Sequence, residues 1–542
     1  MEDSCKDCTY TTCARLHSYA AECKLSDGKP CQECVQMANL DSQISQVHSQ
    51  LVQLARKRDT LKTKINQRHE SLIHRLPLSV SSQIFEEYVH QVHSDFDPRV
   101  ISYPTYTRDW SPALFLSSIC AMWREIAFAT SEIWRFINIP LLKNNPNVDL
   151  KIKLLNEYVE RACQRTLFIG VFQFRLDEYP NSFDLEEKLD KLEPLFESIK
   201  EIACRSEEIT LWGLPIYALK LIIPTNSPDL SVVRIAESVR DFPDVDSEWP
   251  GLWNSGFFTL GSPLLRNLEF GFGSNCLLEK CRIEWDTITT VTMSAIRVNE
   301  GIDILRRASC LTSCSLIFDE DYDYYYNSVI VNPPIQVVNS TLEKLHIDFS
   351  KSRMEFDRQF ASSVTLPSLQ DLSLRTSTLS SMKPLFERSQ CQIRTLSLTF
   401  TQNIPEDDLL MLLSILPSVE HLALEISLQV AINRPIITRK FFEGLRDPRF
   451  NLGGASVNLL LPKLTLFSYT GRMYFTWPSF FKMFPPPGEV VLAAGRPLSE
   501  VSLKLNLPKN NIGDLDVVAK LREIQQSKIK LVVTDLDGKD LL

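Results

Sequence analysis

The stretch LPSLQDLSLRTS at residues 366–377 returns in similar form as LPSVEHLALEIS at residues 416–427. In both, leucines alternate with polar residues after a Leu-Pro-Ser turn, and such a period of two is typical of a half-buried strand. Segments between such phrases have a helical pattern, as in KPLFERSQ (383–390) and DDLLMLLSIL (407–416). The remaining phrases of this kind are EEITLWGLP (207–215), PLLRNLEFGF (263–272), TITTVTMSAI (287–296), LTSCSLIFDE (311–320), TLEKLHIDFS (341–350), IRTLSLTFT (393–401), LPKLTLFSYTG (461–471) and LSEVSLKLN (498–506).

The spacing of these phrases predicts a repeat array over residues 150–542. The phrases recur roughly every 23–31 residues in the middle and about every 37–45 near the end. A strand and a helix at this period indicate an α/β leucine-rich-repeat-like solenoid, in which neighbouring units bury one another's apolar faces. The array is degenerate, because the usual Asn or Cys after the strand is mostly absent. The alternative is a doubly wound α/β domain, which the lack of a Gly-rich loop after an early strand disfavours.

Residues 39–70 carry a heptad pattern. Its apolar positions step by threes and fours, with Arg58 in the one slot that is not apolar, and this predicts a coiled-coil helix. A single amphipathic helix packed on the next domain is the alternative, and the seam also allows self-association between chains. The apolar positions are Leu40, Ile44, Val47, Leu51, Leu54, Leu61 and Ile65.

Residues 71–140 are expected to form a small helical module. The proline-started LIHRLPLSVSSQIFEEYV (72–89) predicts one helix, and the apolar ALFLSSICAMWREIAFATSEIW (113–134) predicts another after an inserted loop. Three short helices cannot bury so many Leu, Ile and Trp side chains internally, so exposed ones would mark a partner surface. The alternative is that these residues pack on the solenoid or the coiled coil.

The first 38 residues form a Cys-rich segment. Two Cys-x2-Cys pairs with 22 residues between them could supply four thiolates to one structural zinc. The four ligands would be Cys5, Cys8, Cys31 and Cys34, with Cys13 and Cys23 as additional candidates. The alternative is a tail with reactive thiols. Residues 1–34 hold four Lys/Arg against six Asp/Glu, so a DNA-binding zinc cluster would lack its electrostatic attraction to phosphate.

Composition excludes several classes of function. The net charge of −9 over 542 residues speaks against general nucleic-acid binding. No apolar run reaches the ~18 residues that a membrane helix needs, and the polar start MEDSCKDCTY is unlike a secretory signal. Reduced thiols in the cytoplasm or nucleus are therefore expected. The sequence has no P-loop, HExxH, GxSxG or kinase motif set, so it predicts a protein that is not an enzyme.

The helical module resembles an F-box. That motif begins with Leu-Pro, continues into an "xxIF" helix, and ends with a Val-Cys-x-x-Trp-like helix and a second Trp. The matching residues here are Leu76, Pro77, Ile84, Phe85, Ile119, Cys120, Trp123 and Trp134. With heptads before it, a loop within it and a degenerate leucine-rich array after it, the chain is similar to the F-box-like families of basidiomycete (mushroom-forming) fungi. Ser79 and Val80 stand where an F-box usually carries a glutamate.

The resemblance implies a function and an α+β multidomain fold. A coiled-coil helix would precede the F-box-like module, and the solenoid would follow it. Such a protein would be the substrate-recognition subunit of a Skp-cullin-F-box ubiquitin ligase. The eight matching residues would dock a Skp-type adaptor, which joins the cullin core, and the solenoid would hold a target protein of unknown identity. No cofactor is required beyond the candidate zinc. The alternatives are a non-catalytic interaction scaffold and, more weakly, a zinc-cluster transcription regulator.

Overall fold

The structure, a computed structural model, divides into two compact units, Met1–Ile84 and Phe85–Leu542. It describes residues 32–68, 76–94, 111–141, 147–173, 191–214, 216–224, 227–236, 258–271, 281–319, 336–352, 354–402, 404–426, 437–446, 451–452, 455–456, 460–484, 497–506, 515–526 and 529–541. In the first unit, helix α2 (Gln32–Arg68) covers nearly all of the predicted coiled-coil range. Helix α3 (Leu78–Ser94) begins in the first unit and continues into the second.

The second unit is built on one 14-stranded sheet in which every neighbouring pair is parallel. The strands lie side by side in chain order without a reversal. A doubly wound sheet reverses its strand order at a switch point, so this topology differs from that alternative. The strands are β1 (Phe136–Leu141), β2 (Leu167–Gln173), β3 (Ser206–Trp212), β4 (Val232–Ala236), β6 (Asn267–Gly271), β8 (Thr290–Ile296), β9 (Ser313–Asp319), β11 (Lys344–Lys351), β13 (Asp371–Thr376), β14 (Thr395–Phe400), β15 (His421–Ile426), β18 (Leu466–Arg472), β19 (Glu500–Asn506) and β20 (Lys530–Asp535).

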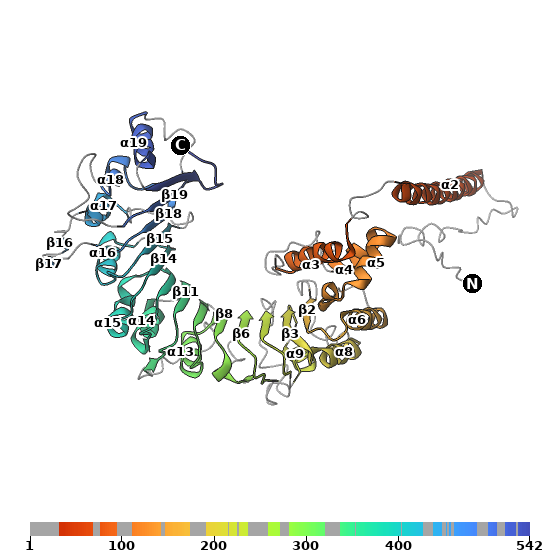
Figure 1. Ribbon diagram of the computed structural model, residues 1–542, viewed down its shortest axis with the longest axis horizontal. Coiled ribbons are helices and arrows are strands. Elements are labelled where there is room, and N and C mark those ends of the chain that lie inside the picture. The colour runs from red at the N-terminus through yellow and green to blue at the C-terminus, as the bar shows by residue number, and fades with distance from the viewer. Residues whose placement is uncertain are drawn as a thin grey trace. The chain divides into compact units, whose positions relative to one another are not determined.

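Helices connect most of these strands and lie along one side of the sheet, as the labels α13 to α19 in Figure 1 show. They are α6 (Val148–Ala162), α8 (Glu193–Ala203), α9 (Ile216–Ile222), α13 (Val298–Arg307), α14 (Met354–Ser363), α15 (Lys383–Ser389), α16 (Glu406–Ser414), α17 (Arg439–Arg446), α18 (Trp477–Phe481) and α19 (Leu515–Gln526). Parallel neighbours require such crossovers, because a tight turn cannot join them.

Short elements complete the second unit. The 3-10 helix η3 (Trp285–Thr287) precedes β8, and the 3-10 helix η5 (Ser380–Met382) leads into α15. Three two-stranded sheets pair β5 (Phe258–Leu260) with β7 (Cys281–Ile283), β10 (Val337–Val338) with β12 (Val364–Thr365), and β16 (Asn451–Leu452) with β17 (Ala455–Ser456).

The core follows from the alternation within each strand. In β14, for example, Leu396, Leu398 and Phe400 are fully buried, while the residues between them are partly exposed. The register places Leu398 between Leu374 of β13 and Leu424 of β15, so neighbouring strands stack their apolar side chains in rows. Each strand therefore shares its buried apolar side chains with both of its neighbours in the sheet.

Buried polar side chains join segments of the second unit that are far apart in the sequence. Asn339 donates to the carbonyls of Leu305 and Ala308, both at 3.0 Å, and accepts from the backbone N–H of Leu342 at 3.0 Å. Ser418 makes a similar bond later in the chain, where its hydroxyl donates to the carbonyl of Ile393 at 2.7 Å. These bonds satisfy backbone carbonyls that burial would otherwise leave unpaired.

Candidate functional site

The F-box-like residues of the first unit lie at the start of α3. The Pro77 carbonyl accepts hydrogen bonds from the backbone N–H groups of Val80 (3.0 Å) and Ser81 (3.1 Å). Pro77 therefore stands immediately before the first helical turn, where its fixed φ and missing N–H cost nothing. Leu76 is half-buried, and Ile84 is 48% exposed. Among the described residues of the first unit, this part of α3 thus presents an uncovered apolar side chain.

In the second unit, α3 contributes a buried aromatic residue. Phe85 is 1% exposed, and its ring lies 5.0 Å from that of Trp123. Val89, one turn further, is fully buried. The structure thus brings together two of the predicted docking residues, which are 38 positions apart in the sequence, and gives Phe85 a packing role.

The single helix expected over residues 113–134 is broken, and this corrects the sequence prediction. Helix α4 (Pro112–Ile119) ends at Cys120, α5 (Ala121–Ala129) begins after it, and the 3-10 helix η2 (Ser131–Arg135) follows. Cys120 has extended backbone angles, and its Sγ accepts a hydrogen bond from the backbone N–H of Trp123 at 3.4 Å. Cys120 is therefore the N-cap of α5, and it satisfies a backbone donor that helix starts leave unpaired.

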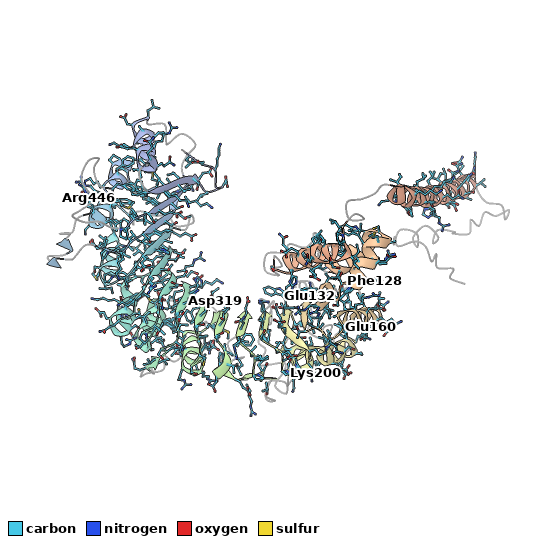
Figure 2. All side chains as sticks on the ribbon, viewed as in Figure 1. Phe128, Glu132, Glu160, Lys200, Asp319 and Arg446 are labelled. Carbon is cyan, nitrogen blue, oxygen red and sulfur yellow. The ribbon has the colours of Figure 1, made fainter. Side chains whose placement is uncertain are left out.

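Trp134 anchors the module to α6. It is 1% exposed, and its indole Nε1 donates to the carbonyl of Ala127 at 2.7 Å. Its ring meets that of Tyr158 edge-on at 4.9 Å. The Arg161 guanidinium lies 3.6 Å from the ring centroid of Phe128, which Figure 2 labels. Trp134 therefore stabilises the helices from within, and its predicted place in adaptor docking stays a prediction.

The last turns of α3 pack on the first two strands of the sheet. The His93 ring lies 4.6 Å from that of Phe136 and 5.4 Å from that of Phe168. Burial, with the Arg234 guanidinium and the His90 imidazole as further causes, lowers the pKa of His93 to about 4. His93 is thus neutral at neutral pH and acts as an aromatic packing residue.

Apolar side chains remain exposed on these helices. In the second unit, Ile119 is 43% exposed, Phe128 42%, and Tyr88 and Phe115 39% each. In the first unit, Leu78 and Val80 are exposed along with Ile84. Residues of this kind on short helices are the type of group that partner proteins cover. Among the large apolar residues of the predicted set, Ile84 and Ile119 are the two that are exposed.

The sheet has a polar face, which sequence reasoning did not single out. On the six strands from β11 to β19, one cross-strand row consists of small or polar side chains, all partly exposed: His346, Ser373, Ser397, Ala423, Ser468 and Ser502. The His346 Nδ1 lies 2.8 Å from the Ser373 Oγ. In the neighbouring row, Arg375 pairs with Asp348 at 3.4 Å. The alternation in each strand phrase already implied these rows, because every second residue points to the same face.

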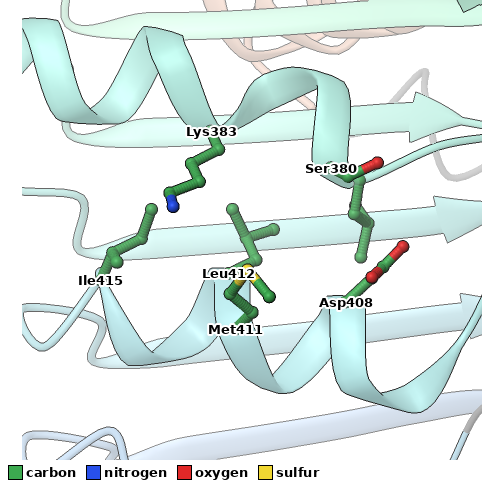
Figure 3. A pocket seen from close by; sticks show the side chains of 7 residues that line it. Ser380, Lys383, Asp408, Met411, Leu412 and Ile415 are labelled. Atoms are coloured by element: carbon green, nitrogen blue, oxygen red, sulfur yellow. The ribbon is translucent and has the colours of Figure 1, made fainter. Parts of the chain in front are cut away.

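A shallow pocket lies on the helical side of the sheet, between α15 and α16. Ser380, Lys383, Asp408 and Met411 are among its lining residues, and Figure 3 shows their side chains around it. Its volume of about 10 Å³ compares with the ~300–1,000 Å³ of a small-molecule site. This pocket has room for about one water molecule.

The predicted zinc ligands fall where the structure gives no side chains. Cys5, Cys8, Cys13, Cys23 and Cys31 lie outside the described residues. Cys34 lies in α2, but its side chain is likewise not described. Among the described side chains, no three His, Cys, Asp or Glu residues gather as a metal site would require. No helix within the described ranges is long and apolar enough to cross a membrane.

Comparisons with known proteins leave the family open. No profile of a known protein family matches the chain, and no curated protein matches it significantly.

Proposed function

We propose that this protein is a non-catalytic receptor that brings a target protein to a Skp-cullin-F-box ubiquitin ligase, in the cytoplasm or nucleus. The helices α3, α4 and α5 would dock a Skp-type adaptor. The parallel sheet and its helices would form a degenerate leucine-rich-repeat-like solenoid that holds the target. Such a receptor accelerates ubiquitin transfer by proximity, because it raises the concentration of target lysines near the activated ubiquitin.

The observation that carries this proposal is that some of the F-box-like residues are buried and others are exposed. Phe85 and Trp134 are buried, so they hold the helices. Ile84 and Ile119 leave almost half of their side chains exposed, although both are large and apolar. A partner surface requires such a pairing of rigid support with uncovered apolar groups, since hot-spot residues bind best when they are held in place.

Binding of purified adaptor to the full chain tests this proposal. We expect wild type to bind a Skp-type adaptor, and Ile84→Asp and Ile119→Asp each to weaken the affinity more than tenfold, because each puts a charge into an apolar contact. Leu150→Asp on α6 is the matched control, since Leu150 is 59% exposed and outside the predicted set. Circular dichroism checks that all variants fold. Failure of the wild type to bind would overturn the proposal.

A non-catalytic scaffold is the second candidate, and one contact favours it. Because His93 of α3 packs on Phe136 and Phe168, the helical module covers the first strands of the sheet. A module that serves only as this cover would leave Ile84 and Ile119 without a function. The same binding measurement separates the two candidates, because the scaffold predicts no adaptor affinity for wild type.

A further inference from the structure

Helix α2 carries an apolar seam that the described residues of its own unit leave uncovered. Eight side chains at heptad spacing are between 50% (Ile44) and 64% (Leu51) exposed. They are Met37, Leu40, Ile44, Val47, Leu51, Leu54, Leu61 and Ile65. A lone helix in water gains little from such a stripe, so its stability depends on a partner that buries the stripe.

The seam has the pattern of a coiled coil. Ile44, Leu51 and Ile65 occupy a positions, and Leu40, Val47, Leu54 and Leu61 occupy d positions. A stripe confined to a and d positions is narrow enough for one partner helix to cover, as in a two-stranded coiled coil. Arg58 takes the one a position between Met37 and Ile65 that is not apolar, and its guanidinium pairs with Asp59 at 3.0 Å. One polar residue at such a position is tolerated and restricts how the helices align.

The charge along α2 decides the direction of pairing. Residues 32–54 contain two acidic residues and no Lys or Arg, whereas residues 55–68 contain six Lys/Arg and one Asp, so the net charges are −2 and +5. A parallel pair would place the two basic halves together, with Lys57 beside Lys62 of the partner subunit and the two Arg58 residues face to face. An antiparallel pair places each basic half against a neutral or acidic half, which is the favourable arrangement.

The antiparallel pair also has one register that fills the whole seam. In this register, the numbers of two facing residues add up to 105. Ile44 therefore faces the partner's Leu61, and Leu51 faces the partner's Leu54. Arg58 then faces the partner's Val47. On the flank of the seam, Asp41 lies opposite the partner's Lys62, and the symmetry of the pair produces this contact twice. Opposite charges at flanking positions set partner choice and orientation in coiled coils.

We infer that α2 binds α2 of a second copy of this chain as an antiparallel two-stranded coiled coil. The inference does not depend on adaptor docking. At about 1.5 Å per residue, the 31 steps from Met37 to Arg68 place the two Arg68 ends roughly 45 Å apart. The segments that follow α2 in the two copies therefore start from opposite ends of the pair. A dimer of this kind would engage its ligands through two sites, which strengthens binding to any target that presents two contacts.

Sedimentation of the full chain tests the pairing. We expect wild type to sediment as a dimer, at twice the 62.0 kDa of the chain, across micromolar concentrations. Leu51→Glu places a charge at the centre of the seam and should produce a monomer. Ser49→Glu adds the same charge on the opposite side of the helix and should leave the dimer intact. A monomeric wild type, or a trimer or tetramer, would overturn the inference.

Charge exchange tests the direction. Asp41→Lys and Lys62→Asp should each weaken the dimer on the order of tenfold, because each creates two like-charge contacts in the antiparallel register. A mixture of the two variants should restore tight pairing as a heterodimer. In a parallel pair, Lys62→Asp would instead meet the partner's Lys57 and strengthen the dimer. A tighter Lys62→Asp dimer would thus refute the antiparallel arrangement.

Discussion

The thiol of Cys120 sets the start of α5 with one hydrogen bond to the backbone N–H of Trp123. Serine at this position would provide a stronger acceptor, whereas valine provides none. We expect Cys120→Ser to leave the stability of the chain unchanged or slightly higher. Cys120→Val should cost about 1 kcal/mol, the usual value of a lost N-cap. Urea unfolding of both variants and wild type measures this difference, and equal stability of the two variants would contradict the capping role.

The N-cap at Cys120 also shows why the sequence alone does not predict the break between α4 and α5. The apolar pattern of residues 113–134 continues without a Gly, a Pro or a strong N-cap residue at Cys120, so it predicts one helix. Cysteine is a weak acceptor and is rarely read as a cap, yet its extended backbone ends α4 here. Among the predicted docking residues, Pro77 lies where its geometry requires. Burial of Trp134 could not be predicted, because it depends on α6, which lies beyond the motif.

At the scale of elements, the sequence predicts strands well where one face of the sheet is polar. Each of the ten alternating phrases overlaps one of the observed strands of the large sheet. The phrases miss β1, β2, β4 and β20, and in β2 the run LFIGVF shows no alternation. The reason is structural: α3 covers the other face of the sheet there, with His93 packed against Phe168, so both faces of β2 select apolar residues.

The contact of α3 with the sheet should weaken in acid. The folded-state pKa of His93, about 4, lies below the ordinary value of 6.5. As pH falls through about 6.5, His93 takes up a proton in the unfolded chain before it does so in the folded chain. The free energy of unfolding therefore falls between pH ~6.5 and ~4. The loss should be about 2 kcal/mol at pH 5 relative to pH 7.5. His93→Phe keeps a ring against Phe136 and should remove that part of the loss.

Urea midpoints at these two pH values measure the effect. The control is His421→Gln, which removes an exposed imidazole on β15 and should keep the full acid sensitivity. An unchanged pH dependence in His93→Phe would mean that the packing of His93 does not oppose its protonation.

For the whole molecule, the order of the strands determines how stability is shared. Each strand of the large sheet pairs only with its predecessor and its successor in that order. If the second unit is a repeat array, damage should spread mainly to adjacent units, because stability is then a sum of unit and neighbour terms. A single globular core would instead lose stability everywhere together.

Leu398→Ala distinguishes these two behaviours. Leu398 on β14 is fully buried and is paired in register with Leu374 of β13 and Leu424 of β15. Truncation should cost about 2–5 kcal/mol, from lost burial and the cavity that remains. Hydrogen exchange followed by mass spectrometry should show faster exchange in β13, β14 and β15 and little change in β1 to β3. Uniformly faster exchange across all strands would instead indicate one cooperative core, and the target-binding sheet of the proposed receptor could then not be read as an array of repeats.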